Sequence, residues 1–396
     1  MSEQKNKILF AVEQISTQMR ELALAIHSRP ELSFAEHYAS AALLAPLQKA
    51  GFQIETGIAG LETAFRARLD SGRPGPRVAL LAEYDALPEL GHACGHNLIG
   101  TASVTAALAL AGSGMLETGV LEVIGTPAEE EGGGKIIMAS HGLFNDVDAV
   151  MMFHPREKNM MTRGALACVD ATFKFFGKAA HAASAPHLGI SALDAVIQTF
   201  VGINALRQFF TDDVRVHGII THGGSATNIV PAYAEAKFLM RAATVSGLQS
   251  VRSKILAAAE GAAVMSGVRL EIEEGLTYAE RNNNQTLAAL FQANMEQLGL
   301  VADASPQSGG VGSSDIGNVS QITAAIHPYL RIGDAIPHTA EFATAAASDA
   351  GIDAMLNAAR ALAMTAYDLQ HSGHFQAVRD EFSAWQTAQL SPGVNK

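Results

Sequence analysis

Apolar residues recur every three or four positions near the N-terminus, from Ile8 to Ile26. This spacing predicts an amphipathic helix, because residues three and four apart share one helix face. A second helix is predicted between Ser33, a residue type that caps helix N-termini, and Gly51, a residue type that ends helices.

Short apolar runs separated by turn residues follow this helical part. They predict strands at 52–56, 61–69, 77–84, 120–127 and 149–155. A helix is predicted over 101–114, between the third and fourth of these strands. Strands that alternate with helices indicate an α/β sheet with crossover connections, and such sheets bind ligands beyond the carboxyl ends of their strands.

The pattern changes from about Val169. Strands and helices are predicted in the order β-α-β-β-α-β, over 169–177, 191–209, 214–221, 234–242, 248–267 and 268–274. This order is the ferredoxin-like arrangement. After Tyr278 the mixed helix and sheet pattern resumes. We therefore expect a larger domain made of residues 1–168 and 279–396, with residues 169–278 inserted as a separate small domain.

Composition restricts the class of protein. A chain of 396 residues with 48% hydrophobic and 17% charged residues can form about two to three folded domains. A net charge of −12 argues against a nucleic-acid partner, since phosphate binding needs clusters of Lys and Arg. The polar N-terminus has no signal-peptide core, and no apolar run is long enough to cross a bilayer. Because two cysteines cannot form a disulfide framework, we expect a cytoplasmic protein with reduced thiols.

Polar residues follow three of the predicted buried strands. Ionisable groups at such places are costly unless they are paired or bind a metal. Each of them alone has an ordinary structural explanation, but their joint placement favours a metal site, and a mixed set of Cys, His and carboxylate ligands suits zinc, with manganese or cobalt as alternatives. The candidates are Asp85, Cys94, His96, Glu129, Glu130, Glu131, His154 and, later in the chain, His338.

A catalytic cysteine–histidine pair is the alternative chemistry, because Cys94 lies between His92 and His96. Residues so close in sequence rarely form such a pair, and the pair would leave Glu129 and His154 unexplained. Cys168 is interpreted as a small buried apolar residue.

The chain resembles the dinuclear-metal aminoacylase and carboxypeptidase family of amidohydrolases, peptidase family M20. Within it, the sequence is most similar to the branch of p-aminobenzoyl-glutamate hydrolase and mammalian β-alanyl dipeptidase-like proteins. The resemblance implies a zinc-peptidase-like mixed sheet with flanking helices and an inserted ferredoxin-like dimerisation or lid domain. It rests on AEYDALPELGHACGHNLIG, GTPAEEEGGGK, FHP, GKAAHAASAPHLGISALDAV, GGSATNIVPAYAEAKFLMR, GSSDIGNVS and IPHTAEF, in family order over nearly the whole chain.

The resemblance also implies roles for individual residues in the larger domain. Glu129 takes the position of the general base, and Asp85 that of a carboxylate that orients a ligand. Because Glu131 extends the pair of glutamates to three, the general base and the metal ligand could each lie one residue further along the chain. Glu83 stands where the broader family has a histidine ligand, and His96 is expected to replace it. The implied ligands of two divalent ions are Cys94, as the bridging ligand, His96, Glu130, His154 and His338.

In the small domain, His181 resembles the histidine that reaches the partner subunit's active site and polarises the scissile carbonyl. Asn228 and Arg241 resemble residues that bind the transition-state oxygen and the substrate carboxylate, and Ser314 is a further substrate-binding candidate. The resemblance therefore implies a homodimer formed through the inserted domain.

The sequence as a whole predicts a metal-dependent amidohydrolase, acting on a small substrate that carries a carboxylate. The substrate is an N-acyl amino acid, a dipeptide or an aroyl-glutamate. The alternative is an aminohydrolase that deaminates an aromatic amino acid such as an aminobenzoate, because Arg241 needs only a carboxylate to bind. A binding protein with a decayed site is a third hypothesis, which the complete set of ligands disfavours.

Overall fold

The computed structural model describes residues 1–305, 311–371 and 373–390, and it divides the chain into two compact units. The larger unit comprises Met1–Gly164, Arg281–Val311 and Asn318–Lys396, and the smaller unit comprises Ala165–Glu280 and Gly312–Gly317. The short segment Gly312–Gly317 packs with the smaller unit, whereas the sequence pattern assigned it to the larger domain. Among the described residues, no helix is both long and apolar enough to cross a membrane.

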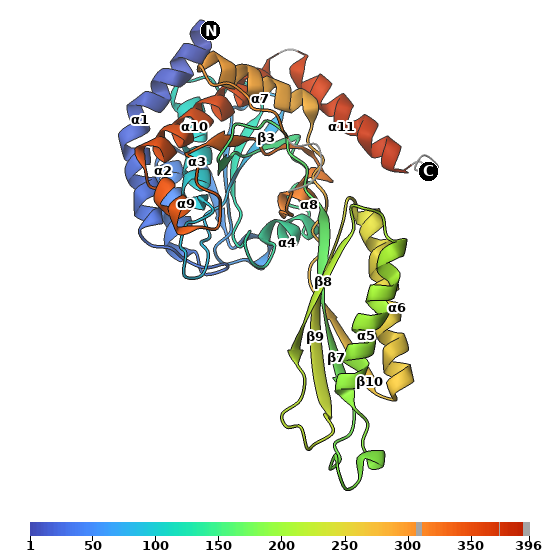
Figure 1. Ribbon diagram of the computed structural model, residues 1–396. Helices are drawn as coiled ribbons and strands as arrows, with labels where there is room; N and C mark the ends of the chain where they lie inside the picture. Colours follow the sequence, from blue (N-terminus) through green and yellow to red (C-terminus); the bar gives the residue numbers. More distant parts are fainter. Residues whose placement is uncertain (306–310, 372, 391–396) are drawn as a thin grey trace. The chain divides into compact units, whose positions relative to one another are not determined.

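The larger unit is built on a mixed six-stranded sheet with the order β1-β2-β4-β3-β5-β11 (Figure 1). Strand β2 runs antiparallel to β1 and β4, whereas β3 is parallel to both of its neighbours and β11 is parallel to β5. The parallel part confirms the predicted α/β character. The strands are β1 (Gln53–Thr56), β2 (Phe65–Asp70), β3 (Arg77–Ala82), β4 (Val120–Gly125), β5 (Ala149–Met151) and β11 (Ala324–Ile326).

Four helices pack together beside this sheet (Figure 1). The central one, α3, contacts the three other helices as well as β3 and β4, and it is therefore buried on nearly every side. Its alanine-rich sequence allows this close packing, because small side chains let neighbouring elements approach. The helices are α1 (Glu3–His27), α2 (His37–Lys49), α3 (His96–Gly112) and α10 (Asp349–Gln370).

Shorter elements complete the larger unit. Strands β6 (His154–Arg156) and β12 (Tyr329–Arg331) form a separate parallel pair. Helix α7 packs against β11, α10 and α11. The remaining helices are η1 (Ile58–Gly60), α4 (Gly134–Ser140), α7 (Gln285–Gln297), α8 (Ile316–Ser320, which begins in the smaller unit), α9 (Ala340–Ala345) and α11 (His374–Leu390).

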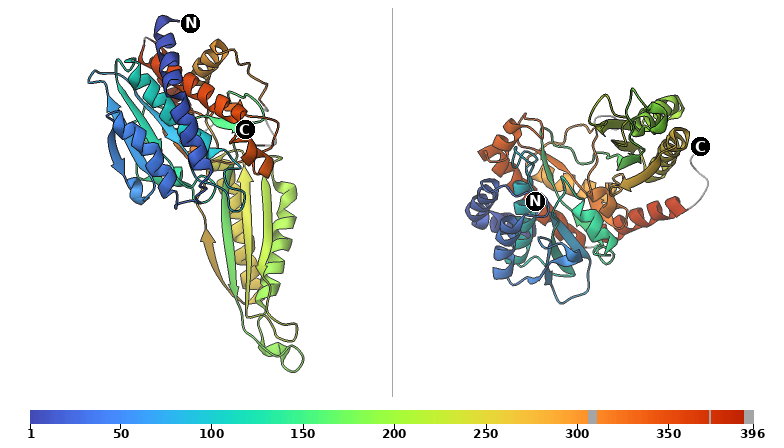
Figure 2. Two further views of the ribbon diagram at one scale, coloured as in Figure 1. Left: turned by 90° about the vertical axis from the view of Figure 1, so that its left-hand side faces the viewer. Right: turned by 90° about the horizontal axis from the view of Figure 1, so that it is seen from below.

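The smaller unit is a four-stranded antiparallel sheet, order β10-β7-β9-β8, with two helices on one face (Figures 1 and 2). Buried and partly exposed residues alternate along β7 and β9, so one face of the sheet packs against the helices. The β-α-β-β-α-β order is confirmed. Its elements are β7 (Ala167–Phe176), η2 (Pro186–Leu188), α5 (Ala192–Leu206), η3 (Arg207–Phe209), β8 (Arg215–His222), β9 (Tyr233–Ala242), α6 (Val245–Ser266) and β10 (Arg269–Glu274).

Three local predictions were wrong. Ser33 does not cap the second helix: α2 begins at His37, and the Glu31 carboxylate accepts hydrogen bonds from two N–H groups of its first turn. The helix expected over 101–114 begins earlier, at His96, because Gly95 turns the chain with a φ of 79°. The strand expected over 149–155 is divided into β5 and β6, and β6 pairs with β12 instead of the main sheet.

The core of the smaller unit should depend strongly on Phe238. Its ring is buried, lies 4.7 Å from the ring of Phe200 and 5.6 Å from that of Phe173, and fills space left by Gly218. Phe238→Ala should therefore cost about 3–5 kcal/mol of unfolding free energy in urea, followed by circular dichroism. Phe209→Ala, at a side chain that is 69% exposed, should change the free energy by less than about 0.5 kcal/mol. Equal losses in the two variants would contradict this account of the core.

Candidate metal centre

Three parallel strands bring the candidate residues to one edge of the main sheet. Because β3 runs parallel to β4 and β5, the carboxyl ends of all three strands lie at the same edge. Glu83 and Asp85 follow β3, Glu129 and Glu130 follow β4, and His154 lies three residues beyond β5. The fold thus places carboxylates and an imidazole from distant parts of the sequence close together.

The loop that carries Cys94 packs against the segment that carries His154. Gly95 lies against Pro155 so closely that a Cβ atom would collide with the proline ring. The Sγ atom of Cys94 lies 3.4 Å from Nε2 of His154, and both side chains are buried. His338 joins the same loop through its backbone, since its N–H donates to the carbonyl oxygen of Ala93 over 2.9 Å.

His96 has one ring nitrogen that is bonded and one that faces the site. Its Nδ1 lies 2.9 Å from Oδ1 and 3.0 Å from the backbone oxygen of Asp85, so this nitrogen is the donor. Its Nε2 is buried without a hydrogen-bond partner and lies 3.5, 3.8 and 3.9 Å from oxygens of Glu83, Glu130 and Glu129. A buried ring nitrogen that faces carboxylates, on a histidine held by a further carboxylate, is the arrangement expected of a metal ligand, which gives up its proton when an ion binds.

Burial and neighbouring charges shift the pKa values of these groups. Burial by itself would raise the pKa of Asp85, but the charge and hydrogen bond of His96 outweigh it and lower that pKa to about 2. Burial would lower the pKa of His96, but Asp85 and Cys94 raise it well above its usual value. Burial lowers the pKa of His154. Asp85 and His96 thus form a buried ion pair, with His154 neutral beside it.

The Cys94 thiol lies in surroundings that oppose its ionisation. Burial raises its pKa, and the negative charge of Glu130 raises it further. A nucleophilic cysteine needs the opposite, a thiol pKa lowered by positive surroundings. These surroundings therefore disfavour an ionised, nucleophilic Cys94, although its Sγ atom lies 3.4 Å from Nε2 of His154. A divalent cation is the partner that would let this thiol ionise.

Among the described residues, several overlapping sets of side chains could hold a metal ion, each with ligand atoms within 4.8 Å of one another. Cys94 belongs to two of them, so two ions could share its sulfur. The set of thiol, imidazole and carboxylate donors fits divalent transition metals. The side chain of His338 is 55% exposed and the others are largely buried. The three sets in this unit are Cys94 with His96 and His154, Cys94 with Glu130 and His338, and His96 with Glu129 and Glu130.

A buried ion pair that sequence reasoning did not predict borders the centre. The Nζ atom of Lys135, on α4, lies 2.6 Å from Oε1 of Glu83, and neither side chain is exposed. The lysine thus offsets the charge of the buried Glu83 carboxylate. His92 is also buried, beside His27, and burial lowers its pKa to about 3. It belongs to none of the donor sets found among the described residues.

The substrate-binding candidates lie in the smaller unit. His181 is exposed, and its Nδ1 accepts from the backbone N–H groups of the two residues at 183 and 184. Asn228 is also exposed and lies on the facing segment. Its backbone carbonyl oxygen accepts from the N–H of Ala182. Arg241 donates to Oγ of Ser313 over 2.7 Å, next to the buried Ser314. The structure therefore places His181 and Asn228 on two neighbouring segments, and Arg241 beside the residue that precedes Ser314.

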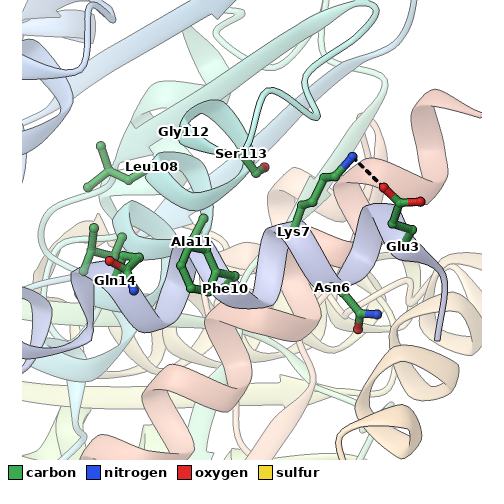
Figure 3. Close-up of a pocket in the computed structure, with 10 residues that line it drawn as sticks. Glu3, Asn6, Lys7, Phe10, Ala11, Gln14, Leu108, Gly112 and Ser113 are labelled. Carbon is green, nitrogen blue, oxygen red and sulfur yellow. Dashed lines mark ion pairs between the residues drawn. The ribbon is translucent and has the colours of Figure 1, made fainter.

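A separate cavity of about 610 Å³ lies along α1 and the end of α3 (Figure 3). Phe10, Lys7 and Leu108 are among the residues that line it, and no candidate site residue does. The cavity is therefore distinct from the centre formed by Cys94 and its neighbours.

Comparison with known proteins identifies the family. Residues 164–264 match the family model of the peptidase dimerisation domain of M20 enzymes. The Xaa-Arg dipeptidase of Mus musculus is 39% identical, over 96% of this chain and 92% of the relative. The human Xaa-Arg dipeptidase is 37% identical, over 94% and 90%. One of the subunits that form the p-aminobenzoyl-glutamate hydrolase of Escherichia coli is 36% identical, over 72% of this chain and 63% of the relative.

Solved structures share the fold at lower identity. An aminobenzoyl-glutamate utilization protein from Klebsiella pneumoniae superposes with a TM-score of 0.74 at 21% identity, covering 91% of this chain and 98% of its own. A dinuclear metal-binding peptidase of the M20 family from Bacillus subtilis gives 0.70 at 20% identity, covering 90% and 99%. Sequence identity over nearly the full length, together with this fold and centre, shows that the chain belongs to the M20 family of metal-dependent amidohydrolases.

Proposed function

We propose that this amidohydrolase is a dipeptidase that cleaves dipeptides with a free C-terminal carboxylate, and that dipeptides ending in arginine are its best substrates. The observation that carries the proposal is the convergence of Cys94, His96, Glu130 and His154 at one sheet edge, joined by the His338 loop. The Xaa-Arg dipeptidases, similar over more than nine-tenths of this chain, support the choice of substrate. The two free cysteines support a location in the cytoplasm, where thiols stay reduced.

The five donors are proposed to hold two divalent ions, with Cys94 as the shared ligand. Zinc is the first choice, because it accepts thiolate, imidazole and carboxylate together, and manganese or cobalt is the alternative. When bound, such ions lower the pKa of water and stabilise negative charge on the carbonyl oxygen. Asp85 fixes the ring of His96 so that Nε2 points at the ligand position.

The proton transfers are assigned to Glu129. Its carboxylate takes a proton from the attacking water and returns it to the nitrogen of the leaving amine, which makes the amine a better leaving group. His181 and Asn228 are proposed to bind the carbonyl oxygen as negative charge develops on it. Arg241 is proposed to bind the substrate carboxylate through its guanidinium group, with Ser314 beside it.

The smaller unit is proposed to form a homodimer. Strand β8 lies at the edge of its sheet, where its outer backbone groups are available to pair with another strand. The edge exposes Ile219 and Ile220, and α5 exposes Ile197 and Val201. Antiparallel pairing of β8 with the same strand of a second copy would cover these side chains on a two-fold axis. In that dimer His181 of each subunit would act at the partner's centre, as the family resemblance implies.

The activity should be tested with zinc-loaded protein and a panel of amides. The panel contains dipeptides ending in arginine or alanine, an N-acetyl amino acid and p-aminobenzoyl-glutamate, with release of ammonia from an aminobenzoate measured in parallel. We expect fastest turnover of the arginine dipeptides, loss of turnover with a chelator, and recovery on adding metal. Glu129→Gln should lower kcat by about 10²–10⁴-fold. Ammonia release without amide cleavage would instead establish the aminohydrolase.

The role of Cys94 should appear in the metal content of its variants. Cys94→Ser should lose much of the affinity for zinc and nearly all activity, because a neutral hydroxyl is a poor substitute for a thiolate. Cys94→Asp should retain more of both, since a carboxylate can bridge two ions. Cys168→Ser, at the other cysteine of the chain, is the matched control and should bind zinc normally. Full zinc occupancy in Cys94→Ser would exclude the bridging role.

The dimer should dissociate when charge is placed on the exposed edge. The double variant Ile219→Lys/Val201→Lys should shift the mass measured by light scattering from that of a dimer to that of a monomer, because pairing would bury both ammonium groups. Val264→Lys, at an 83% exposed position on α6, should remain dimeric. A native protein that is already monomeric at micromolar concentration would refute the proposal.

A further inference from the structure

The segment Glu31–Glu36, between α1 and α2, contacts both turns that carry the candidate catalytic and metal-binding carboxylates. Within it, Glu36 is fully buried, although it belongs to a residue type that is almost never fully buried without a partner. We propose that Glu36 is a positioning residue that fixes the turn bearing Glu129 and Glu130. The inference rests on the proposed function of Glu129 as general base.

The carboxylate of Glu36 connects three parts of the chain. Its Oε1 accepts from the N–H of Ala128, 2.9 Å away, and from the N–H of Phe34, 3.0 Å away. Its Oε2 accepts from the hydroxyl of Thr63 over 2.8 Å. Both oxygens are therefore held, and one of them binds the residue immediately before Glu129.

The two N–H groups that share Oε1 belong to strained residues. Ala128 has a φ of 61° and Phe34 a φ of 65°, and only three other residues that are not glycine have positive φ in the described chain. Residues with a Cβ atom rarely adopt this left-handed backbone conformation, so surrounding contacts must stabilise it. Glu36 supplies a buried acceptor to both residues at once. Without it, both N–H groups would lose their bond to this acceptor, and the turn could relax to an extended or right-handed form.

Other contacts of the same segment point to the same turns. The hydroxyl of Ser33 donates to Oδ2 of Asp85 over 3.2 Å, and Oδ2 also accepts from the N–H of Glu130. The ring of Phe34 lies against Gly132, where a Cβ atom would collide with it. The segment thus contacts the 128–132 turn at two of its residues, in addition to the indirect link through Asp85.

A turn held in this way keeps Glu129 at one place while its carboxylate changes protonation state. Proton transfer depends on the distance between the carboxylate and the water, and a misplacement of about 1 Å can cost about 10²-fold in rate. The hydrogen bonds of the Glu36 carboxylate join it to Ala128, Phe34 and Thr63, so its effect on catalysis would pass through the backbone at Ala128.

The test compares truncation of Glu36 with truncation of Glu31, in zinc-loaded protein and with a dipeptide ending in arginine as substrate. Glu36→Ala should lower kcat by about 10–100-fold with little change in KM, and the acidic limb of its pH–rate profile should move, because the surroundings of Glu129 change. Glu36→Gln should recover most of kcat, since its amide oxygen can still accept from Ala128.

Glu31→Ala is the matched control. The Glu31 carboxylate also accepts from two backbone N–H groups, but these belong to Tyr38 and Ala39 in the first turn of α2. This variant should have a lower unfolding temperature and an unchanged kcat. Thr63→Val, which removes the hydrogen bond to Oε2 and keeps the side-chain shape, should lower kcat by a smaller factor than Glu36→Ala. It provides the test if Glu36→Ala does not fold.

The outcomes separate this inference from the proposed function. If Glu129→Gln abolishes turnover while Glu36→Ala and Thr63→Val keep the native kcat and pH profile, the positioning role is wrong. It is also wrong if Glu31→Ala loses as much kcat as Glu36→Ala, because the effect would then be one of general stability. If Glu129→Gln keeps full activity, the proposed role of the general base fails, and the inference fails with it.

Discussion

The candidate centre depends on the hydrogen bonds that Asp85 accepts at the carboxyl edge of the sheet. One oxygen accepts from Nδ1 of His96, at the start of α3. The other accepts from the N–H of Glu130 in the turn after β4 and from the hydroxyl of Ser33 before α2. Three segments of the chain are thereby held around one buried carboxylate. Without Asp85, Nδ1 of His96 would lose its carboxylate partner and the Glu130 turn one of its supports.

Burial strengthens the interactions between these charged groups, and it also makes each charge costly in free energy unless a partner lies close by. Charged groups away from water are stabilised only by close partners, because the surroundings screen them little. Asp85 and His96 satisfy this condition as one ion pair, and Glu83 and Lys135 as another. Burial raises the pKa of the Cys94 thiol, the charge of Glu130 raises it further, and the charge of His96 only partly offsets this rise. Among these groups, the thiol is therefore the one whose ionisation a bound cation would change most.

The sequence by itself determined the architecture of the smaller unit and the identity of the chemical groups. Its β-α-β-β-α-β order followed from local alternation along strands such as 234–242, because each strand buries one face against helices of the same unit. The grouping of Cys94, His96, Glu129 and His154 was predictable for a similar reason, since parallel strands end at a common edge.

Only the tertiary structure decided how these groups are held. Serine is a residue type that commonly caps helices, yet the hydroxyl of Ser33 donates a hydrogen bond to Asp85, a residue 52 positions away. Lysine is usually a surface residue, yet Lys135 is buried against Glu83. The carboxylate of Glu36 accepts a hydrogen bond from Ala128, a residue 92 positions away. Local sequence patterns indicate secondary-structure propensity and which face of a helix or strand is buried. The partners of these side chains depend instead on the packing of distant segments. Periodicity along the chain contains no information about such contacts, and so the supports of the centre emerged only from the folded structure.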